Sequence, residues 1–340
     1  MTNPARNAGI DILKALCIVL VVIWHCQPVT PSMLPDNYTA ALLGKQVLEF
    51  FYRNISLLAV PSFILISLYL FVGKLSETED YWKKRLPRLI QVYVFWVGIQ
   101  FILYLLLGGG LPLPLKTIFR SGGPDLPLGA FMPPMPSIFY FLYILIFCTL
   151  LTFLFFKLPG KIRIALAFAI VASSCLYFVY TSANGIGIDT RSMKGYYVYI
   201  PLSYYLYHYR DKFIQYRVLF FVGFILSVFG EWVYFNGMTS AYGRMSVLLG
   251  TLSLTTIFIS GWSKTNTPIR LLSKYSMGIF ALHPYALAAV NVSYALFNKQ
   301  YKVLPAPSAS EGLLLLSAIF VLTCLCVWLM SKVKLSKYVS

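Results

Sequence analysis

Charged residues are scarce in this chain of 340 residues: Asp, Glu, Lys and Arg make up 11% of it, and 11 residues are acidic. Soluble domains carry about 25% charged residues, so these charges are too few to cover the surface of soluble globules of this length. The shortage excludes a secreted domain, a cytosolic enzyme and a soluble DNA-binding protein.

Cysteine and histidine are also few, with six and three residues. Every cysteine falls within or beside an apolar run, no Cys-x-x-Cys spacing occurs, and no cysteine stands at zinc-finger spacing from a histidine. The sequence therefore predicts buried free thiols, with no disulfide framework and no metal site.

Apolar residues, by contrast, make up 59% of the chain, and its mean hydropathy is +0.73. Runs near the ~20 residues that cross a hydrocarbon core recur along it. We therefore predict an all-α, polytopic membrane helix bundle of about ten transmembrane helices, forming a single domain over residues 1–340 with no appended soluble domain. The predicted spans are 10–29, 47–73, 87–108, 137–156, 162–182, 195–209, 217–236, 244–262, 275–297 and 311–331.

The distribution of basic residues predicts the orientation of these spans. The net charge is +17, but Lys and Arg lie in short loops between apolar runs, so we expect no nucleic acid partner. Of the 28 basic residues, 18 fall in the loop set that contains both termini and nine in the opposite set. The positive-inside rule therefore predicts cytoplasmic termini. It also places the Gly- and Pro-rich loop of about 109–136 outside, where a loop of that length suits a lid, a binding loop or disorder.

The first span carries three ionisable residues, Asp11, Lys14 and His25, and such residues are costly inside a membrane. Lys14 and His25 are eleven residues apart, which is three helical turns plus about 20°, or about 16 Å along one face. Asp11 can pair with Lys14. Taken singly, Lys14 suits a snorkelling residue and His25 an interface residue. Together they favour a functional site, in which the His25 imidazole acts as a general base.

The other ionisable residues within spans carry less weight. Glu231, in the seventh span, is a candidate for a second polar partner in a cavity. His283, which precedes Pro284, is expected to be structural, and His208 to belong to an interfacial aromatic belt. We therefore expect no other histidine beside His25 in the core.

Two arginines, Arg85 and Arg88, are three residues apart in the segment YWKKRLPRLIQVYVFW. Proline is favoured in the first turn of a helix, so Pro87 predicts that both guanidinium groups lie near a helix N-terminus at the cytoplasmic surface. Paired arginines at such an end suit a phosphate group. The alternative is a positive-inside anchor in contact with lipid headgroups.

These patterns resemble the integral-membrane acyltransferases of the acyltransferase-3 type, which modify surface carbohydrates. The family's basic residue, ten-residue spacer and histidine correspond to Lys14 and His25, and its Arg-x-x-Arg pattern to Arg85 and Arg88. Leu68 stands where the family usually has glycine, which concerns helix packing more than chemistry. Further similar segments are GIDILKAL, VPSFILISLYLF, PSIFYFLYIL, IPLSYYLYHYR and SKYSMGIFALHPY.

The resemblance implies acyl transfer across a membrane, with a particular class of donor and of acceptor. Acyl-CoA, usually acetyl-CoA, would bind from the cytoplasm, with Arg85, Arg88 and Lys14 near its phosphates. His25 would act on the hydroxyl of an extracytoplasmic carbohydrate or lipid-linked sugar, as a base or as a carrier of the acyl group, and Asp11 with Lys14 would fix the helix entrance. The expected setting is a bacterial cytoplasmic (inner) membrane, among membrane lipids, with cell-envelope polysaccharide as the material modified.

A function from another class stays open, namely a secondary transporter or exporter of a small polar or anionic solute. Transporters of this kind use inverted repeats and broken helices near the midplane. No internal repeat is evident here, and acidic residues in the middle of spans are nearly absent. Both observations favour the acyltransferase.

Overall fold

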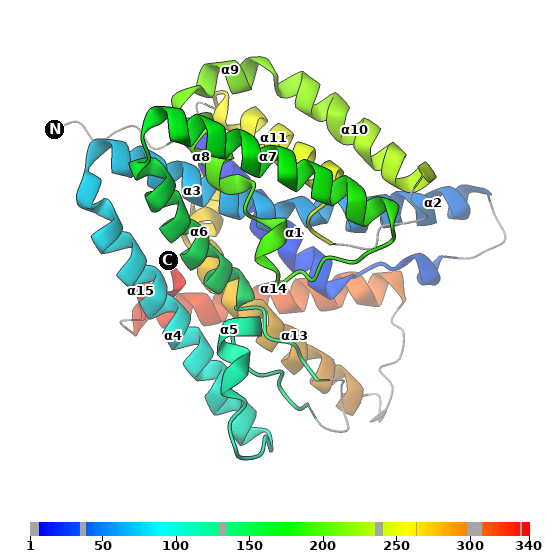
Figure 1. Cartoon of the computed structure of the whole chain (residues 1–340). Helices are drawn as coiled ribbons and strands as arrows, with labels where there is room; N and C mark the ends of the chain where they lie inside the picture. The colour runs from blue at the N-terminus through cyan, green and yellow to red at the C-terminus, as the bar shows by residue number, and fades with distance from the viewer. Residues whose placement is uncertain are drawn as a thin grey trace. The chain divides into compact units, whose positions relative to one another are not determined.

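The computed structural model describes residues 7–34, 39–128, 134–234, 241–262, 264–297, 308–333 and 335–340. Within these ranges the regular secondary structure is helical, apart from an isolated antiparallel bridge between Leu126 and Met135 (Figure 1). Outside them lie residues 129–133 of the long predicted loop, the last two residues of the predicted span 217–236, and four basic residues used to predict the orientation: Arg6, Lys299, Lys302 and Lys334.

A helix is found in each of the ten predicted spans. These helices are α1 (Ala8–Cys26), α3 (Ala59–Glu77), α4 (Trp82–Leu106), α6 (Tyr140–Lys157), α7 (Gly160–Ala183), α8 (Tyr199–His208), α10 (Arg217–Tyr234), α11 (Met245–Ile259), α13 (Ser276–Phe297) and α14 (Ala309–Lys332). Five further α-helices complete the described set of α-helices: α2 (Thr39–Phe50), α5 (Ile118–Ser121), α9 (Arg210–Gln215), α12 (Thr267–Lys274) and α15 (Ser336–Val339).

Seven helical stretches among the described residues are long and apolar enough to cross a membrane. This finding confirms an all-α polytopic membrane bundle, whereas the number ten and the cytoplasmic termini stay predictions. The predicted span 195–209 is wrong in length, because α8 has ten residues and covers about 15 Å, half of a hydrocarbon core. This segment is rich in tyrosine, which favours the membrane interface.

The outer surfaces of the long helices are apolar. In α7 and α14, only 17% of the most apolar stretch is buried within the protein, and Phe168, Leu176, Val321 and Trp328 are exposed. Buried positions, in contrast, include many serines and threonines. An exposed apolar surface of this extent fits a protein whose surroundings are lipid.

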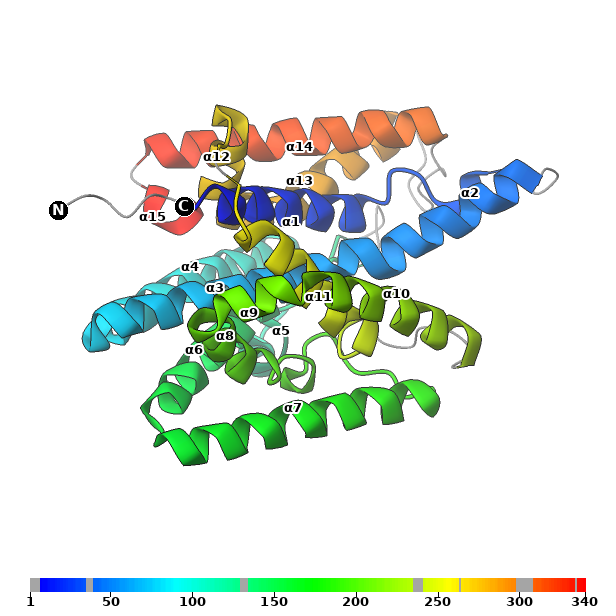
Figure 2. The same cartoon turned by 90° about the horizontal axis from the view of Figure 1, so that it is seen from above.

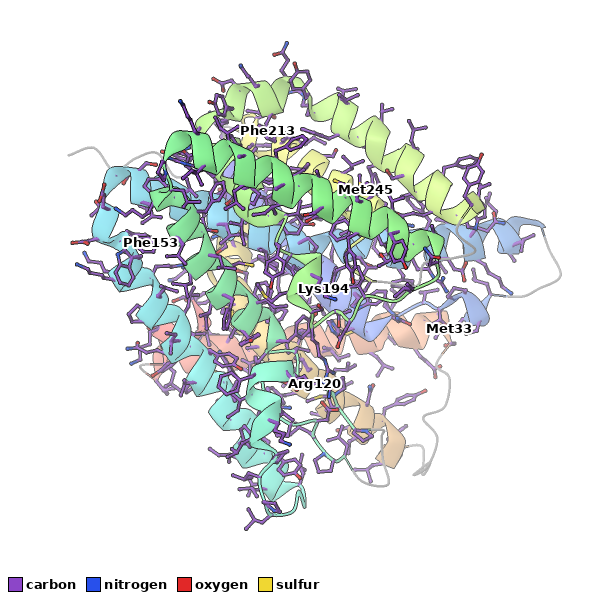
Figure 3. All side chains as sticks on the ribbon, in the orientation of Figure 1. Met33, Arg120, Phe153, Lys194, Phe213 and Met245 are labelled. Carbon is purple, nitrogen blue, oxygen red and sulfur yellow. The ribbon has the colours of Figure 1, made fainter. Side chains whose placement is uncertain are left out.

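The chain divides into two compact units, and unit 1 comprises Met1–Cys17, Arg53–Leu89 and Ile144–Ser273. Its centre is formed by α3, which packs against α8 and α11, and α11 in turn packs against α10; the last two helices lie side by side in Figures 1 and 2. Phe153 of α6, labelled in Figure 3, stacks on Trp82 at the start of α4, with 4.9 Å between ring centroids.

Unit 2 comprises Ile18–Tyr52, Ile90–Tyr143 and Lys274–Ser340. Here α13 packs against α14, and the short α15 contacts both. The α15 helix also packs against α4. The rings of Phe95 and Tyr338 stack with 3.9 Å between centroids, and the indole Nε1 of Trp96 donates to the Tyr338 carbonyl at 3.1 Å.

The chain that leaves the end of α1 is fixed by two contacts in unit 2. The hydroxyl of Tyr52 donates to the Val29 carbonyl at 2.8 Å. Gly312, in the first turn of α14, approaches the Pro28 backbone so closely that a Cβ atom there would lie 1.8 Å from the Pro28 carbonyl oxygen. These contacts hold the last turn of α1, which carries His25.

We predict that Gly312→Ala destabilises the protein, because the added methyl group can be accommodated only if α14 moves away from residue 28. Overpacking of this kind costs about 1–3 kcal/mol or more. The measurement is the thermal midpoint of the detergent-solubilised protein. Gly98→Ala is the matched control, because Gly98 lies within α4 with no atom within 4 Å of an added Cβ, and alanine is favoured over glycine in a helix by about 1 kcal/mol. Equal midpoints for the two variants would contradict the close approach.

Candidate functional site

Two imidazole rings lie together in unit 2. His25 comes from the last turn of α1 and His283 from the second turn of α13, with ring centroids 4.8 Å apart and ring planes inclined by 56°. The His25 side chain is exposed, whereas His283 is fully buried. The predicted reactive imidazole is therefore accessible on one side and faces a second imidazole within the protein.

The hydrogen bonds of these rings indicate which nitrogen of each neutral ring carries the hydrogen. His25 Nδ1 lies 2.9 Å from the Val21 carbonyl oxygen, and His283 Nδ1 lies 3.2 Å from that of Ile279. A carbonyl oxygen only accepts hydrogen bonds, so each Nδ1 carries the hydrogen and each neutral ring keeps its lone pair on Nε2. Among the described residues, no hydrogen-bond partner is found for His283 Nε2. Both Nε2 atoms are thus available as acceptors.

The expectation that the core holds no other histidine is wrong. His283 is 0% exposed and contacts His25 directly. The sequence offered only a weak signal, since all three histidines fall within predicted spans. It did not show which faces of the first and ninth predicted helices meet, because that depends on tertiary packing.

The long loop between α4 and α6 is tied to the helix that carries His283. Gln100 of α4 donates through Nε2 to the Pro124 carbonyl of the loop at 2.8 Å, and its Oε1 accepts a hydrogen bond from the Tyr285 hydroxyl at 2.5 Å. The loop is also closed on itself, because the Ser137 hydroxyl donates to the Gly122 carbonyl at 2.8 Å. Ser121, Leu126 and Ser137 of this loop are buried, whereas Leu111 and Phe119 are exposed, so only the later part of the loop belongs to the packed interior of unit 2.

The arginine pair lies in unit 1. Arg85 is half-buried and donates from Nη2 to the Ser67 hydroxyl of α3 at 2.8 Å, whereas Arg88 is exposed. Lys83, a neighbouring cation, pairs with Asp80 at 3.0 Å. The contact between Arg85 and Ser67 joins two of the segments on which the resemblance to the acyltransferases rests.

The predicted helix start at Pro87 is wrong. The α4 helix begins at Trp82, directly after a 3-10 turn over Glu79–Tyr81, so Pro87 is the sixth residue of the helix. Lysine and arginine are good helix formers, and they extend the helix outward from the apolar run. Arg85 remains in the first turn, where backbone N–H groups lack partners within the helix, and Arg88 lies almost one turn further along.

The start of α1 lies in unit 1 with Asp11 and Lys14. Asp11 is buried, and its Oδ1 accepts a hydrogen bond from the Ser273 hydroxyl of α12 at 2.6 Å. Lys14 is half-buried. Asp11 therefore fastens α12 to the first turn of α1, a contact that the sequence did not indicate. Of the predicted site residues, His25 lies in unit 2, and Asp11, Lys14, Arg85 and Arg88 lie in unit 1.

Glu231 has a structural environment in unit 1. Its carboxylate accepts hydrogen bonds from the Ser246 backbone N–H at 3.0 Å and the Ser246 hydroxyl at 2.6 Å. Arg244 lies 3.4 Å from the same carboxylate and donates to the Arg53 carbonyl at 2.5 Å. Both charged side chains are buried. This network joins α10 to the start of α11.

A comparison with protein families matches residues 7–332 to the acyltransferase-3 family, described as an acyltransferase domain. Because the match covers nearly the whole chain, the protein belongs to this family and is a membrane acyltransferase. Neither the curated proteins nor the solved structures give a significant match. The reaction class requires an acyl donor and an acceptor. No group of three or more metal-ligating side chains is found in the described part of the chain.

We predict that Glu231→Ala strongly lowers the stability of the protein, because it leaves the Arg244 guanidinium buried without its counter-ion. Removing one partner of a buried pair costs about 3–5 kcal/mol. Thermal unfolding in detergent measures the effect, and the exposed pair provides the control, since Lys83→Ala should cost at most about 1 kcal/mol. The double variant Glu231→Met with Arg244→Met should recover much of the loss. A single variant as stable as Lys83→Ala would show that the network is dispensable.

Proposed function

We propose that this protein transfers an acyl group, acetyl in the simplest case, from cytoplasmic acyl-CoA to a hydroxyl of an extracytoplasmic glycan or lipid-linked sugar. His25 is the catalytic residue in this proposal. The observation that carries it is the state of the His25 ring, whose Nδ1 is bound to the Val21 carbonyl at 2.9 Å. The ring thereby presents an accessible Nε2 lone pair, as a general base or a nucleophile requires.

The chemistry at Nε2 is acyl transfer to oxygen. As a base, His25 takes the proton of the acceptor hydroxyl while the oxygen bonds to the acyl carbon, and the thioester carbon–sulfur bond breaks. The proton then passes to the sulfur of CoA, which leaves as the thiol. A route through an acyl group on Nε2 uses the same atom. The neutral imidazole suits either route near neutral pH.

The donor side of the proposal rests on the cationic residues of unit 1. CoA carries several phosphate oxygens, and guanidinium groups bind such oxygens through charge-assisted hydrogen bonds. Arg88 is exposed, and Arg85 is half-buried with one N–H group held by Ser67. Lys14, half-buried in α1, is a further cation for the same anion. The buried Asp11 holds the entrance of α1 through Ser273.

The exposed apolar surface supports a membrane setting for the proposed reaction. We place the protein in a bacterial cytoplasmic membrane as a single acyltransferase domain, with acyl-CoA, a sugar acceptor and membrane lipids as its partners. The excess of basic residues in one loop set supports cytoplasmic entry of acyl-CoA. Polysaccharide of the cell envelope is the material that such a transferase would modify.

We predict that His25→Ala abolishes transfer, because loss of a positioned proton acceptor costs about 10²–10⁴-fold in rate. A deletion strain complemented with the wild type or the variant is compared by mass spectrometry of its surface glycan. His208→Ala is the matched control, because His208 is exposed and its Nδ1 contacts the carbonyl four residues earlier at 3.1 Å, as in His25. The control should keep wild-type acylation at equal membrane abundance.

Vesicles of known orientation complete this test. Labelled acetyl-CoA supplied to the cytoplasmic face should yield labelled glycan on the other face, and acetyl-CoA supplied to the outer face should not. Equal glycan acylation by the wild type and His25→Ala would overturn the catalytic role of His25. Movement of intact acetyl-CoA or sugar across the membrane without an acylated product would favour the transporter.

We predict that Arg85→Ala and Arg88→Ala raise the KM for acyl-CoA more than that for the acceptor. Losing a charge-assisted hydrogen bond corresponds to about a 10- to 150-fold change in affinity. Lys83→Ala and Lys84→Ala are controls that remove neighbouring cations from the same helix. Arg85→Lys separates loss of charge from loss of the bond to Ser67. Wild-type affinity of both alanine variants for acetyl-CoA in calorimetry would leave the arginines as a topology anchor only.

A further inference from the structure

We propose that His283 is a positioning residue for the transfer reaction, acting through His25: the lone pair on His283 Nε2 stabilises the positive charge that develops on the neighbouring ring. The inference deepens the proposed function and rests on it. His283 is buried, and the reaction proposed for His25 gives it no role.

The surroundings of His283 are well defined. Its Nδ1 is occupied by the Ile279 carbonyl at 3.2 Å, Phe280 lies edge-on with 6.0 Å between centroids, and His25 is 4.8 Å away. His283 Nε2 is buried without a hydrogen-bond partner in the described structure. The His25 ring, which can carry a proton on either nitrogen, is thus an immediate neighbour of the His283 ring.

An unpaired acceptor in the protein interior is unfavourable, because burial removes the water that would otherwise bind it. Such groups are rare in native proteins, and each calls for a physical reason. A charge that appears only during the reaction supplies that reason. The lone pair has no partner among the described residues, and it gains a favourable interaction when the adjacent ring becomes positive.

Both routes of the proposed reaction create this charge. In direct transfer, the hydroxyl proton moves to His25 Nε2, so that the ring carries hydrogen on both nitrogens until the proton reaches the CoA sulfur. In the covalent route, Nε2 bonds to the acyl carbon and the CoA thiolate leaves. The acceptor oxygen then replaces Nε2 on that carbon, and its proton passes to the thiolate. An interaction stronger in the charged state than in the resting state raises kcat.

The test compares two variants of similar shape, His283→Gln and His283→Met. The glutamine side chain offers an amide oxygen close to the position of Nε2, whereas the methionine fills the space with a much weaker acceptor. Transfer is measured in membrane vesicles with labelled acetyl-CoA and the native acceptor glycan. We expect His283→Met to lower kcat about 10- to 100-fold with KM for acetyl-CoA within about twofold. We expect His283→Gln to retain most of the kcat.

The His283 variants are expected to fold, because removing a buried unpaired acceptor does not destabilise the protein. A change in kcat therefore does not reflect misfolding. His283→Leu provides a second variant without an acceptor, and membrane abundance and the thermal midpoint are measured for each. The inference is overturned if folded Gln and Met variants have equal kcat, or if the Met and Leu variants transfer at the wild-type rate.

A double-mutant comparison shows whether His283 acts through His25. In the background of His25→Gln, which retains a polar side chain at this position, His283→Met should have no further effect on residual transfer. An equal fold loss in both backgrounds overturns the inference. An inactive wild type overturns the proposed function itself, whereas an active wild type, an inactive His25→Ala and a fully active His283→Met overturn this inference alone.

Discussion

Polar groups inside an apolar helix bundle must find their partners within the protein, because lipid offers none. Several charged side chains of this interior follow that constraint. Asp11 is satisfied by Ser273, and Glu231 by Ser246 and Arg244. Each of these contacts also joins two helices, so the polar interior determines how the apolar helices pack. His283 Nε2 is among the buried polar atoms for which the described structure shows no hydrogen-bond partner.

The helices could be predicted from the sequence because long apolar runs leave few alternatives, whereas their ends depend on residues of mixed character. The α4 helix begins five residues before the predicted start, since polar residues that favour helix extend it beyond the apolar run. The α8 helix differs in the opposite direction, because its ten residues are fewer than those of the predicted span 195–209. Apolar composition therefore predicts that a helix exists better than where it begins or ends.

The candidate site was predictable only one helix at a time. Regular spacing placed Lys14 and His25 on one helix, and the structure has both on α1. Spacing cannot show which residue of another helix meets them. His283 is 258 positions from His25, and Ser273 is 262 positions from Asp11. Contacts of this kind arise when helix faces pack, which leaves no periodic pattern in the sequence. The family comparison supplies the class of reaction, but not these contacts.

The bond between His25 Nδ1 and the carbonyl of its own helix has a mechanical consequence. A ring tethered one turn back cannot swing between two substrates as a long, flexible carrier arm does. In the proposed reaction, the donor and the acceptor must therefore travel to a stationary nitrogen and leave it again, so the substrates are the parts that move. Turnover under this proposal is governed by the arrival and departure of acyl-CoA and the sugar acceptor.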